Sequence, residues 1–115
     1  MISKTTFLKC VMALPEIAEA PHFEHQAFKV KNKIVVTLNS KEWRCCVKLS
    51  VEDQELFCLM DKNLIYPVPN KWGKHGWTLV NLKLVSKEIL TSVLTAAYIH
   101  VAPPKLSKIV SQTAL

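Results

Sequence analysis

The chain has 115 residues, of which 50% are hydrophobic and 21% are charged, so we expect a folded globular domain and exclude a disordered chain. The longest uncharged run is shorter than the ~20 apolar residues that a membrane-spanning helix needs. Lys9 interrupts the apolar stretch at the N-terminus, which therefore lacks the pattern of a signal peptide. These bounds predict one domain over residues 1–115, located in the cytoplasm, with no membrane partner.

The formal net charge of +6 lies entirely in the second half of the chain. Residues 1–61 contain eight basic and eight acidic side chains, whereas residues 62–115 contain seven lysines and one acidic residue, Glu88. Such asymmetry indicates an anionic partner, most often nucleic acid. The alternative is a modest positive charge that only keeps a small protein in solution.

The first half of the chain predicts a helix followed by an antiparallel meander. Ser3 is a suitable N-cap for a helix that ends before Pro15. Residues 18–50 then alternate apolar and polar side chains between turn residues, and Asn32 stands where a two-residue hairpin loop requires positive φ. The alternation predicts one buried sheet face, made of Phe28, Val30, Ile34, Val36, Trp43, Val47 and Leu49.

The opposite face of this sheet should carry a cationic stripe. Its members are Lys29, Lys31, Arg44 and Lys48. A sheet with one face in water tolerates such a stripe without any binding role, so the stripe alone does not define a site.

A second helix is expected after this meander, from Ser50 to about residue 62. Ser50 and Asp53 form a variant of the capping box, in which Asp replaces the usual Glu. The apolar residues of this helix are expected in the core, and they are Leu56, Phe57, Leu59 and Met60. Residues 65–69 contain two prolines, which limits them to an edge strand or an extended connection.

The remainder predicts a strand over residues 77–82 and a long helix capped by Ser86. Its apolar stripe consists of Leu90, Val93, Leu94, Ala97 and Val101. Two prolines, Pro103 and Pro104, should end this helix, and a basic tail with one short helical turn should follow.

Both glycines of the chain, Gly73 and Gly76, frame a Lys-His pair between two tryptophans. Glycine adopts positive φ without a Cβ penalty, so this spacing predicts a tight loop that presents cations. We expect Trp77, which begins a strand, to be buried at the base of the loop. Trp72 fits two roles, stacking on a base or fixing the loop to the core.

The sequence predicts no enzyme, no metal and no organic cofactor. It has no nucleophile elbow, P-loop, Rossmann glycine pattern or H-E-x-x-H motif. Four cysteines without a C-x-x-C pair indicate reduced thiols. In an extended chain, His22 and Glu24 would share one face and His25 would take the other, and no third ligand follows at a suitable spacing.

Several segments, in this order and spacing, resemble the MmcQ/YjbR family over nearly the whole chain. They are Leu14-Pro15, Pro21-His22-Phe23-Glu24-His25-Gln26-Ala27-Phe28-Lys29-Val30, Lys33-Ile34, Val47-Lys48-Leu49-Ser50, Trp72-Gly73-Lys74-His75-Gly76-Trp77-Thr78 and Val101-Ala102-Pro103-Pro104-Lys105. The chain departs from the family where Glu24, Gln26 and Asn32 replace frequent Gly, Pro and Gly. The resemblance implies a compact α+β fold, similar to CyaY/frataxin and secretion chaperones, with a proposed double-wing DNA-binding surface.

We therefore expect a small monomeric protein that binds DNA, in preference to RNA, largely without sequence specificity. The expected contact residues lie in the glycine-framed loop and the C-terminal half, and they are Lys71, Trp72, Lys74, His75, Lys83, Lys105 and Lys108. The alternative is a protein-interaction or chaperone-like module that uses the sheet face. Frataxin-like iron handling ranks last, because the carboxylates are few. A contiguous positive surface from the loop to the tail would favour nucleic acid, and an exposed apolar face would favour a protein partner.

Overall fold

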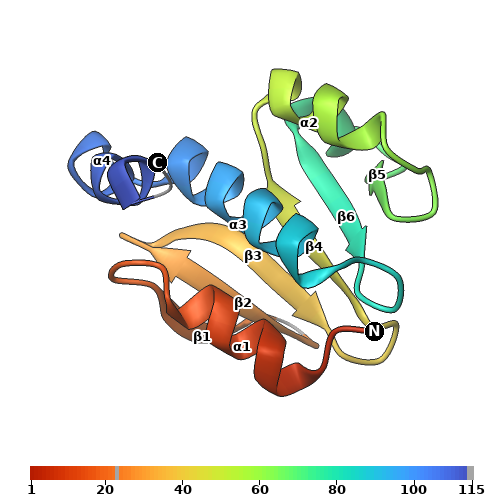
Figure 1. The fold of residues 1–115 in the computed structure, drawn as a ribbon, viewed down its shortest axis with the longest axis horizontal. Coiled ribbons are helices and arrows are strands. Elements are labelled where there is room, and N and C mark those ends of the chain that lie inside the picture. Colours follow the sequence, from red (N-terminus) through yellow and green to blue (C-terminus); the bar gives the residue numbers. More distant parts are fainter. Residues whose placement is uncertain (23, 114–115) are drawn as a thin grey trace.

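The computed structural model describes residues 1–22 and 24–113 and shows the expected α+β architecture (Figure 1). The elements in chain order are α1 (Lys4–Met12), β1 (Ala18–His22), β2 (His25–Val30), β3 (Lys33–Asn39), β4 (Arg44–Lys48), α2 (Val51–Cys58), β5 (Ile65–Pro67), the 3-10 turn η1 (Gly73–His75), β6 (Trp77–Asn81), α3 (Lys87–Val101) and α4 (Pro104–Thr113). Within the described ranges, no helix has the length and apolar character needed to cross a membrane.

The strands form one antiparallel sheet in the order β1-β2-β3-β4-β6-β5. Helix α3 lies across β3 and β4, α1 packs beside α3, and α2 packs against β5 (Figure 1). β1 and β5 are the edges of the sheet, and each carries a proline, Pro21 and Pro67. Of the two structures predicted for residues 65–69, an edge strand or an extended connection, the edge strand is therefore the one formed, over residues 65–67.

Helix starts and one hairpin follow the sequence signals closely. Ser3, Ser50 and Ser86 each accept a hydrogen bond at the side-chain oxygen from the backbone N–H three residues later. In the β2–β3 loop, Lys31 and Asn32 have φ of 48° and 65°. Two consecutive positive φ values match the strand twist of a two-residue hairpin, which confirms the turn predicted at Asn32.

The buried sheet face contains most of the residues that the alternation predicted. Five of them are fully buried, namely Phe28, Val30, Val36, Val47 and Leu49. Ile34 is only partly buried, because the β2–β3 register shifts between Phe28 and Lys29 and gives β3 one extra residue. Val35, which strict alternation places on the outer face, is consequently fully buried in the core.

Trp43 also departs from the prediction that it is a buried strand residue. It has φ of 54° and lies in the turn before β4, where its side chain is half-buried against the core. Its indole Nε1 donates a hydrogen bond of 2.8 Å to the carbonyl oxygen of Ile2. Trp43 therefore fastens the start of the chain to the sheet instead of filling the sheet core.

Helix α2 is shorter than predicted, and the side chains predicted to lie in the core mostly face solvent. The side chains of Leu56, Leu59 and Met60 are 64%, 80% and 49% exposed, whereas polar Gln54 is buried. Only Phe57 of the four predicted core residues packs partly against the core. The orientation follows from Gln54, whose amide bonds the loop below the helix and turns the leucines outward.

The basic tail is a helix of ten residues, α4, and not the single short turn that the sequence predicted. Pro104 is its first residue, a position where the missing N–H leaves no intrahelical bond unmade. Leu106 is buried, and Val110 packs partly against the core. These contacts hold the tail against the end of α3.

Candidate nucleic-acid interface

The glycine-framed segment is the connection between β5 and β6, and each glycine is required for a different reason. Gly76 has φ of 97°, and a Cβ there would lie 1.9 Å from the carbonyl oxygen of Leu49. Gly73 has no positive φ, but a Cβ there would lie 2.1 Å from the carbonyl oxygen of Val68. The backbone thus packs so closely on its neighbours that neither position has room for a side chain.

Hydrogen bonds fix this connection to α2 and β4. The Gln54 Nε2 amide lies 2.9 Å from the Gly73 carbonyl oxygen, 3.2 Å from that of Trp77 and 3.1 Å from Thr78 Oγ1. The Thr78 hydroxyl donates to the carbonyl of Gly76 at 2.9 Å. Among the described residues, every buried side-chain nitrogen and oxygen has a hydrogen-bond partner. These paired contacts hold the connection, residues 68–76, against its neighbours, and we call it the platform.

Cations and tryptophans share the outer side of this platform. Lys74 and His75 are exposed on η1, and the Lys71 Nζ lies 5.9 Å from the ring centroid of Trp72, which is 53% exposed. Trp77 is half-buried at the base of the loop, less than the full burial expected.

Lys48 connects the platform to the sheet. Its Nζ donates to the carbonyl oxygen of His75 and lies 5.4 Å from the ring centroid of Trp77, its strand partner. Beside it, a groove of about 490 Å³ is lined by residues that include Asn32, Lys33, Lys48, Trp77 and His100. The groove brings together the β2–β3 hairpin, the paired ends of β4 and β6, and the end of α3.

A second cavity of about 750 Å³ continues this groove toward α4. Both cavities are lined by Lys33 and His100, and the second extends to Pro104 and Ser107 of α4. Among the described residues that line either cavity, none is acidic. A basic surface therefore runs from the loop platform along the groove to the C-terminal helix.

One acidic side chain reaches the margin of this surface. Glu16 Oε1 accepts a hydrogen bond of 2.9 Å from Lys31 Nζ, and both side chains are more than half exposed. An ion pair in this setting contributes little to stability and leaves Lys31 free to exchange its partner for another anion.

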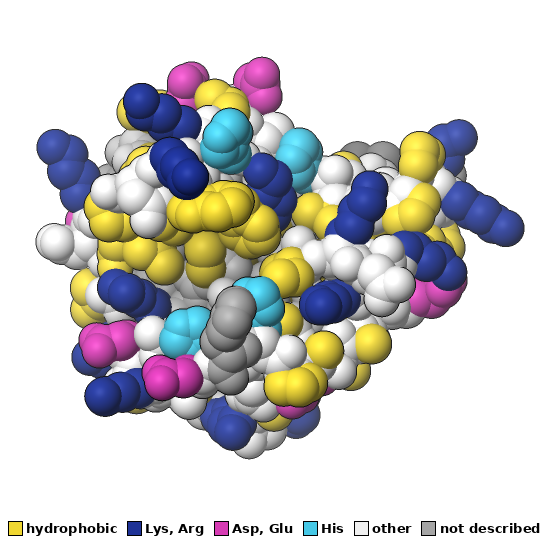
Figure 2. Space-filling model, turned by 180° about the vertical axis from the view of Figure 1, so that it is seen from behind, with side chains coloured by type: hydrophobic (Ala, Val, Ile, Leu, Met, Phe, Trp, Pro, Cys, Tyr) yellow, Lys and Arg dark blue, Asp and Glu magenta, His cyan; other side chains and the backbone are white. Residues whose placement is uncertain are grey.

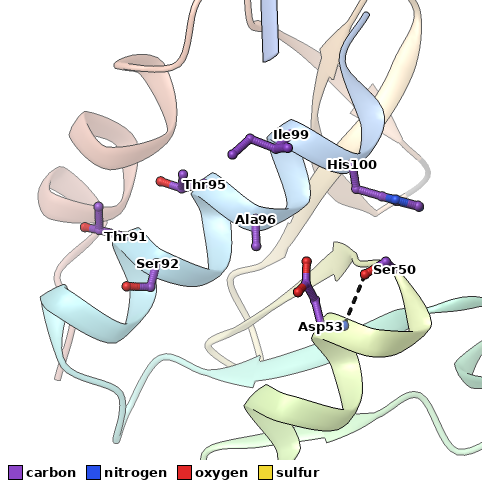
Figure 3. A pocket seen from close by; sticks show the side chains of 8 residues that line it. All are labelled: Ser50, Asp53, Thr91, Ser92, Thr95, Ala96, Ile99 and His100. Carbon is purple, nitrogen blue, oxygen red and sulfur yellow. Dashed lines mark hydrogen bonds between the residues drawn. The ribbon is translucent and has the colours of Figure 1, made fainter. Parts of the chain in front are cut away.

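Figure 3 shows a third cavity, of about 700 Å³, between α3 and the start of α2. Hydroxyl groups of α3 line one side, and Ser50 and Asp53 line the other. Ser50 Oγ accepts from the Asp53 backbone N–H at 3.1 Å, and the Thr91 hydroxyl donates to the carbonyl of Lys87 at 2.8 Å. These two hydroxyls serve their own helices, and His100 stands where all three cavities meet.

The structure places six of the seven predicted contact residues on the elements that border this surface, although none of them lines either cavity. Lys71, Trp72, Lys74 and His75 lie on the platform. Lys105 and Lys108 are exposed on α4 and are neighbours in sequence of Pro104 and Ser107, which line the second cavity.

Lys83 is not brought to this surface. It lies beyond the far end of β6, where its backbone N–H donates to the side chain of Asn81 at 2.9 Å. The groove instead uses Lys33, Lys48 and His100, which the sequence did not single out as contact residues. Two of these residues lie at strand ends and one lies near a helix end, and no local pattern in the sequence indicates that folding brings them together.

The sheet face opposite the helices carries apolar side chains that are partly exposed. Figure 2 shows hydrophobic side chains gathered on this side with Lys and Arg around them. By strand register, Tyr66, Trp77 and Leu79 belong here, and Leu79 is only 9% exposed while the two aromatic residues are half-buried. The large exposed apolar side chains lie elsewhere, and four of them are on or next to α2.

The histidine cluster forms a hairpin end. His22 and His25 are register partners of β1 and β2, so they share one face, contrary to the geometry expected for an extended chain. In the part of the chain that the structure describes, no three His, Cys, Asp or Glu side chains come close enough to hold a metal ion.

The cysteine side chains are buried or half-buried, and their environment does not favour nucleophilic chemistry. Cys45 is fully buried, and burial raises its pKa far above the usual thiol range. Burial also raises the pKa of Cys46 to about 11. Cys10 and Cys58 are free and half-buried. High thiol pKa values disfavour the thiolate, which is the nucleophilic form.

Fold and surface together define a small α+β domain with a basic groove at one end of its sheet. The YjbR family model matches residues 12–100, and the chain belongs to the YjbR family. A search of curated proteins found no match. Among solved structures, the chain is similar to Deinococcus radiodurans protein DR2400, a DUF419-domain protein, with a TM-score of 0.72 and 23% identity over 90% of this chain and 83% of that chain.

Proposed function

We propose that the protein binds nucleic acid, DNA in the first place, through the phosphate backbone and without reading the sequence. The observation that carries the proposal is the continuous basic surface formed by the platform, the groove and α4, with no acidic residue among the described groove-lining residues. Lysine ammonium groups on rigid backbone suit phosphate oxygens, and they supply affinity and orientation but no base discrimination.

The absence of arginine from this surface supports non-specific binding. Arg44 is the one arginine of the sequence, and its register partner is Asn81, at the end of β6 opposite to Trp77. A bidentate guanidinium grip on guanine is therefore not available in the groove. Exposed Trp72 beside Lys71 adds a stacking surface for any unpaired base, which contributes without sequence preference. The proposal assigns no catalytic step to the protein.

Fluorescence anisotropy over a salt series tests this function on two unrelated DNA duplexes. Each lysine that neutralises a phosphate adds about 0.9 to the slope of log K against log salt. Changing Lys71 and Lys74 to Ala should lower the slope by about 2 and weaken binding equally on both duplexes. Lys33→Ala, in the groove, should lower the slope by about 1.

The matched control is the double variant Lys4→Ala with Lys9→Ala, which removes the same charge from exposed positions on α1. Its slope should stay within about 0.5 of the wild-type value, because neither lysine belongs to the surface. If the control and the platform variant lost the same amount of slope, the effect would come from net charge alone and not from the platform. A wild type that binds neither duplex at about 50 mM salt would refute the proposed function.

A second candidate function, a non-enzymatic protein-interaction module, is favoured by a separate observation. The leucines of α2 are exposed beside carboxylates, a combination that nucleic acid does not match. The sheet face, expected to serve this role, has apolar side chains that are less exposed than the leucines of α2.

A further inference from the structure

Helix α2 exposes an apolar and acidic face that no other element covers among the described residues. Leu56 and Leu59 are 64% and 80% exposed, and Met60 just beyond the helix is 49% exposed. A monomeric protein rarely leaves neighbouring large apolar side chains in water without a binding role.

The exposed side chains form one helical face. Glu52, Glu55, Leu56 and Leu59 follow the i, i+3, i+4, i+7 spacing that places side chains on the same side of a helix. All four line a cavity of about 710 Å³ that reaches Pro67 of β5. The groove between α2 and the sheet edge is thus lined by apolar side chains together with two carboxylates.

The negative charge of this face indicates that the partner's contact surface is positively charged. Residues 51–61 contain four carboxylates and no Lys or Arg, in a protein whose net charge is +6. Nucleic acid and anionic membranes would be repelled from the face. Pairing of two α2 helices around a twofold axis would gather the carboxylates of both copies in one interface, with no lysine or arginine in residues 51–61 to offset them. A partner with lysines or arginines beside an apolar stripe complements both properties.

The neighbouring sheet edge indicates the form of the partner. β5 has three residues, and Pro67 and the nearby Pro69 have no backbone N–H to donate. A partner strand could not pair with this edge over a useful length. Docking must therefore rely on side chains in the groove, as an amphipathic helix does.

We propose that the α2 face, defined by Glu52, Glu55, Leu56 and Leu59, binds an amphipathic helix of a partner protein that carries basic residues beside its apolar stripe. The partner's apolar side chains contact Leu56, Leu59 and Pro67, and its cations meet Glu52 and Glu55. This surface acts independently of the nucleic-acid interface, because its charge is opposite and its residues are different.

Two fluorescent synthetic peptides of about 14 residues test the inference with the full chain. One presents leucines at i, i+3, i+4 and i+7 with flanking lysines, and its isomer has glutamates in place of the lysines. The lysine peptide should bind, with the glutamate peptide at least about tenfold weaker. The double variant Leu56→Ser with Leu59→Ser should weaken binding at least about tenfold, and Glu52→Gln with Glu55→Gln should flatten its salt dependence.

Matched controls come from exposed positions outside the face. Leu84→Ser removes a leucine that is 57% exposed near the start of α3, and Glu42→Gln removes an exposed carboxylate. Both should leave peptide affinity within about twofold, and circular dichroism should show all variants folded. Equal binding of the two peptides, no binding, or equal losses in the controls would overturn the proposal. Concentration-dependent self-association that is abolished by the leucine variant would assign the face to a second copy and also overturn it.

Discussion

The side-chain amide of Gln54, on α2, donates a hydrogen bond of 2.9 Å to the backbone carbonyl of Gly73, nineteen residues further along the chain. Gln54 is buried, and its contact is the direct polar link between α2 and the basic platform. The same contact determines two surfaces, because it holds the platform in place and turns Leu56 and Leu59 outward. One buried amide thus orients both candidate interfaces.

Replacing Gln54 with Leu should destabilise the protein although the new residue is more apolar. The carbonyl oxygens of Gly73 and Trp77 would each lose the amide donor and keep one backbone donor, the N–H of Gly76 and of Val68 respectively. Each intramolecular hydrogen bond that is lost costs about 0.5–1.5 kcal/mol. Thermal unfolding should show a midpoint lower by several degrees. Glu55→Leu, on the exposed side of the same helix, is the matched control and should leave the midpoint nearly unchanged.

Gly76→Ala should be among the most damaging single changes in the loop. The substitution combines an unfavourable φ of 97° with a Cβ placed 1.9 Å from the Leu49 carbonyl oxygen. The two effects together should lower the free energy of unfolding by about 3 kcal/mol. Gly73→Ala should cost less, since its clash with Val68 carries no φ penalty. Urea titration measures both, and an equal or smaller loss for Gly76→Ala would contradict this explanation.

The thiols should react in a fixed order with an alkylating reagent. Burial raises the pKa of Cys46 to about 11 and raises that of Cys45 further, so the native protein holds very little thiolate at either position near neutral pH. The same sign predicts loss of stability in alkali, as the unfolded chain ionises before the folded one. Mass spectrometry at about pH 8 should detect Cys10 labelled well before Cys45 and Cys46. Equal labelling rates would contradict the buried positions.

Local signals in the sequence were sufficient for most of the fold. Ser3, Ser50 and Ser86 cap their helices as predicted, and Asn32 forms the expected hairpin turn. These caps and this turn depend on a few adjacent residues, so they can be predicted without knowing which elements pack against them. The extra residue in β3 cannot be predicted from adjacent residues, because a register shift depends on how the partner strand pairs with it.

Long-range contacts determine the rest. The orientation of α2, with its leucines in solvent, depends on hydrogen bonds between Gln54 and residues about twenty positions away. The apolar pattern of this helix alone therefore wrongly predicts that the leucines lie in the core. Lys33, Lys48 and His100 meet only after the sheet and α3 are assembled. Lys83 is the opposite case. It is close to the loop in sequence, which predicts a place on the basic surface, but it lies beyond the far end of β6.

The prolines at the two sheet edges bear on how the protein behaves when it is concentrated. Pro21 in β1 and Pro67 in β5 remove a backbone donor from each outer strand, so neither border offers a complete template for another chain. Edge-to-edge growth of the sheet into fibrils is therefore obstructed at both ends. Pro21→Thr together with Pro67→Thr would open those borders, and the double variant should develop thioflavin fluorescence in conditions where the wild type stays clear.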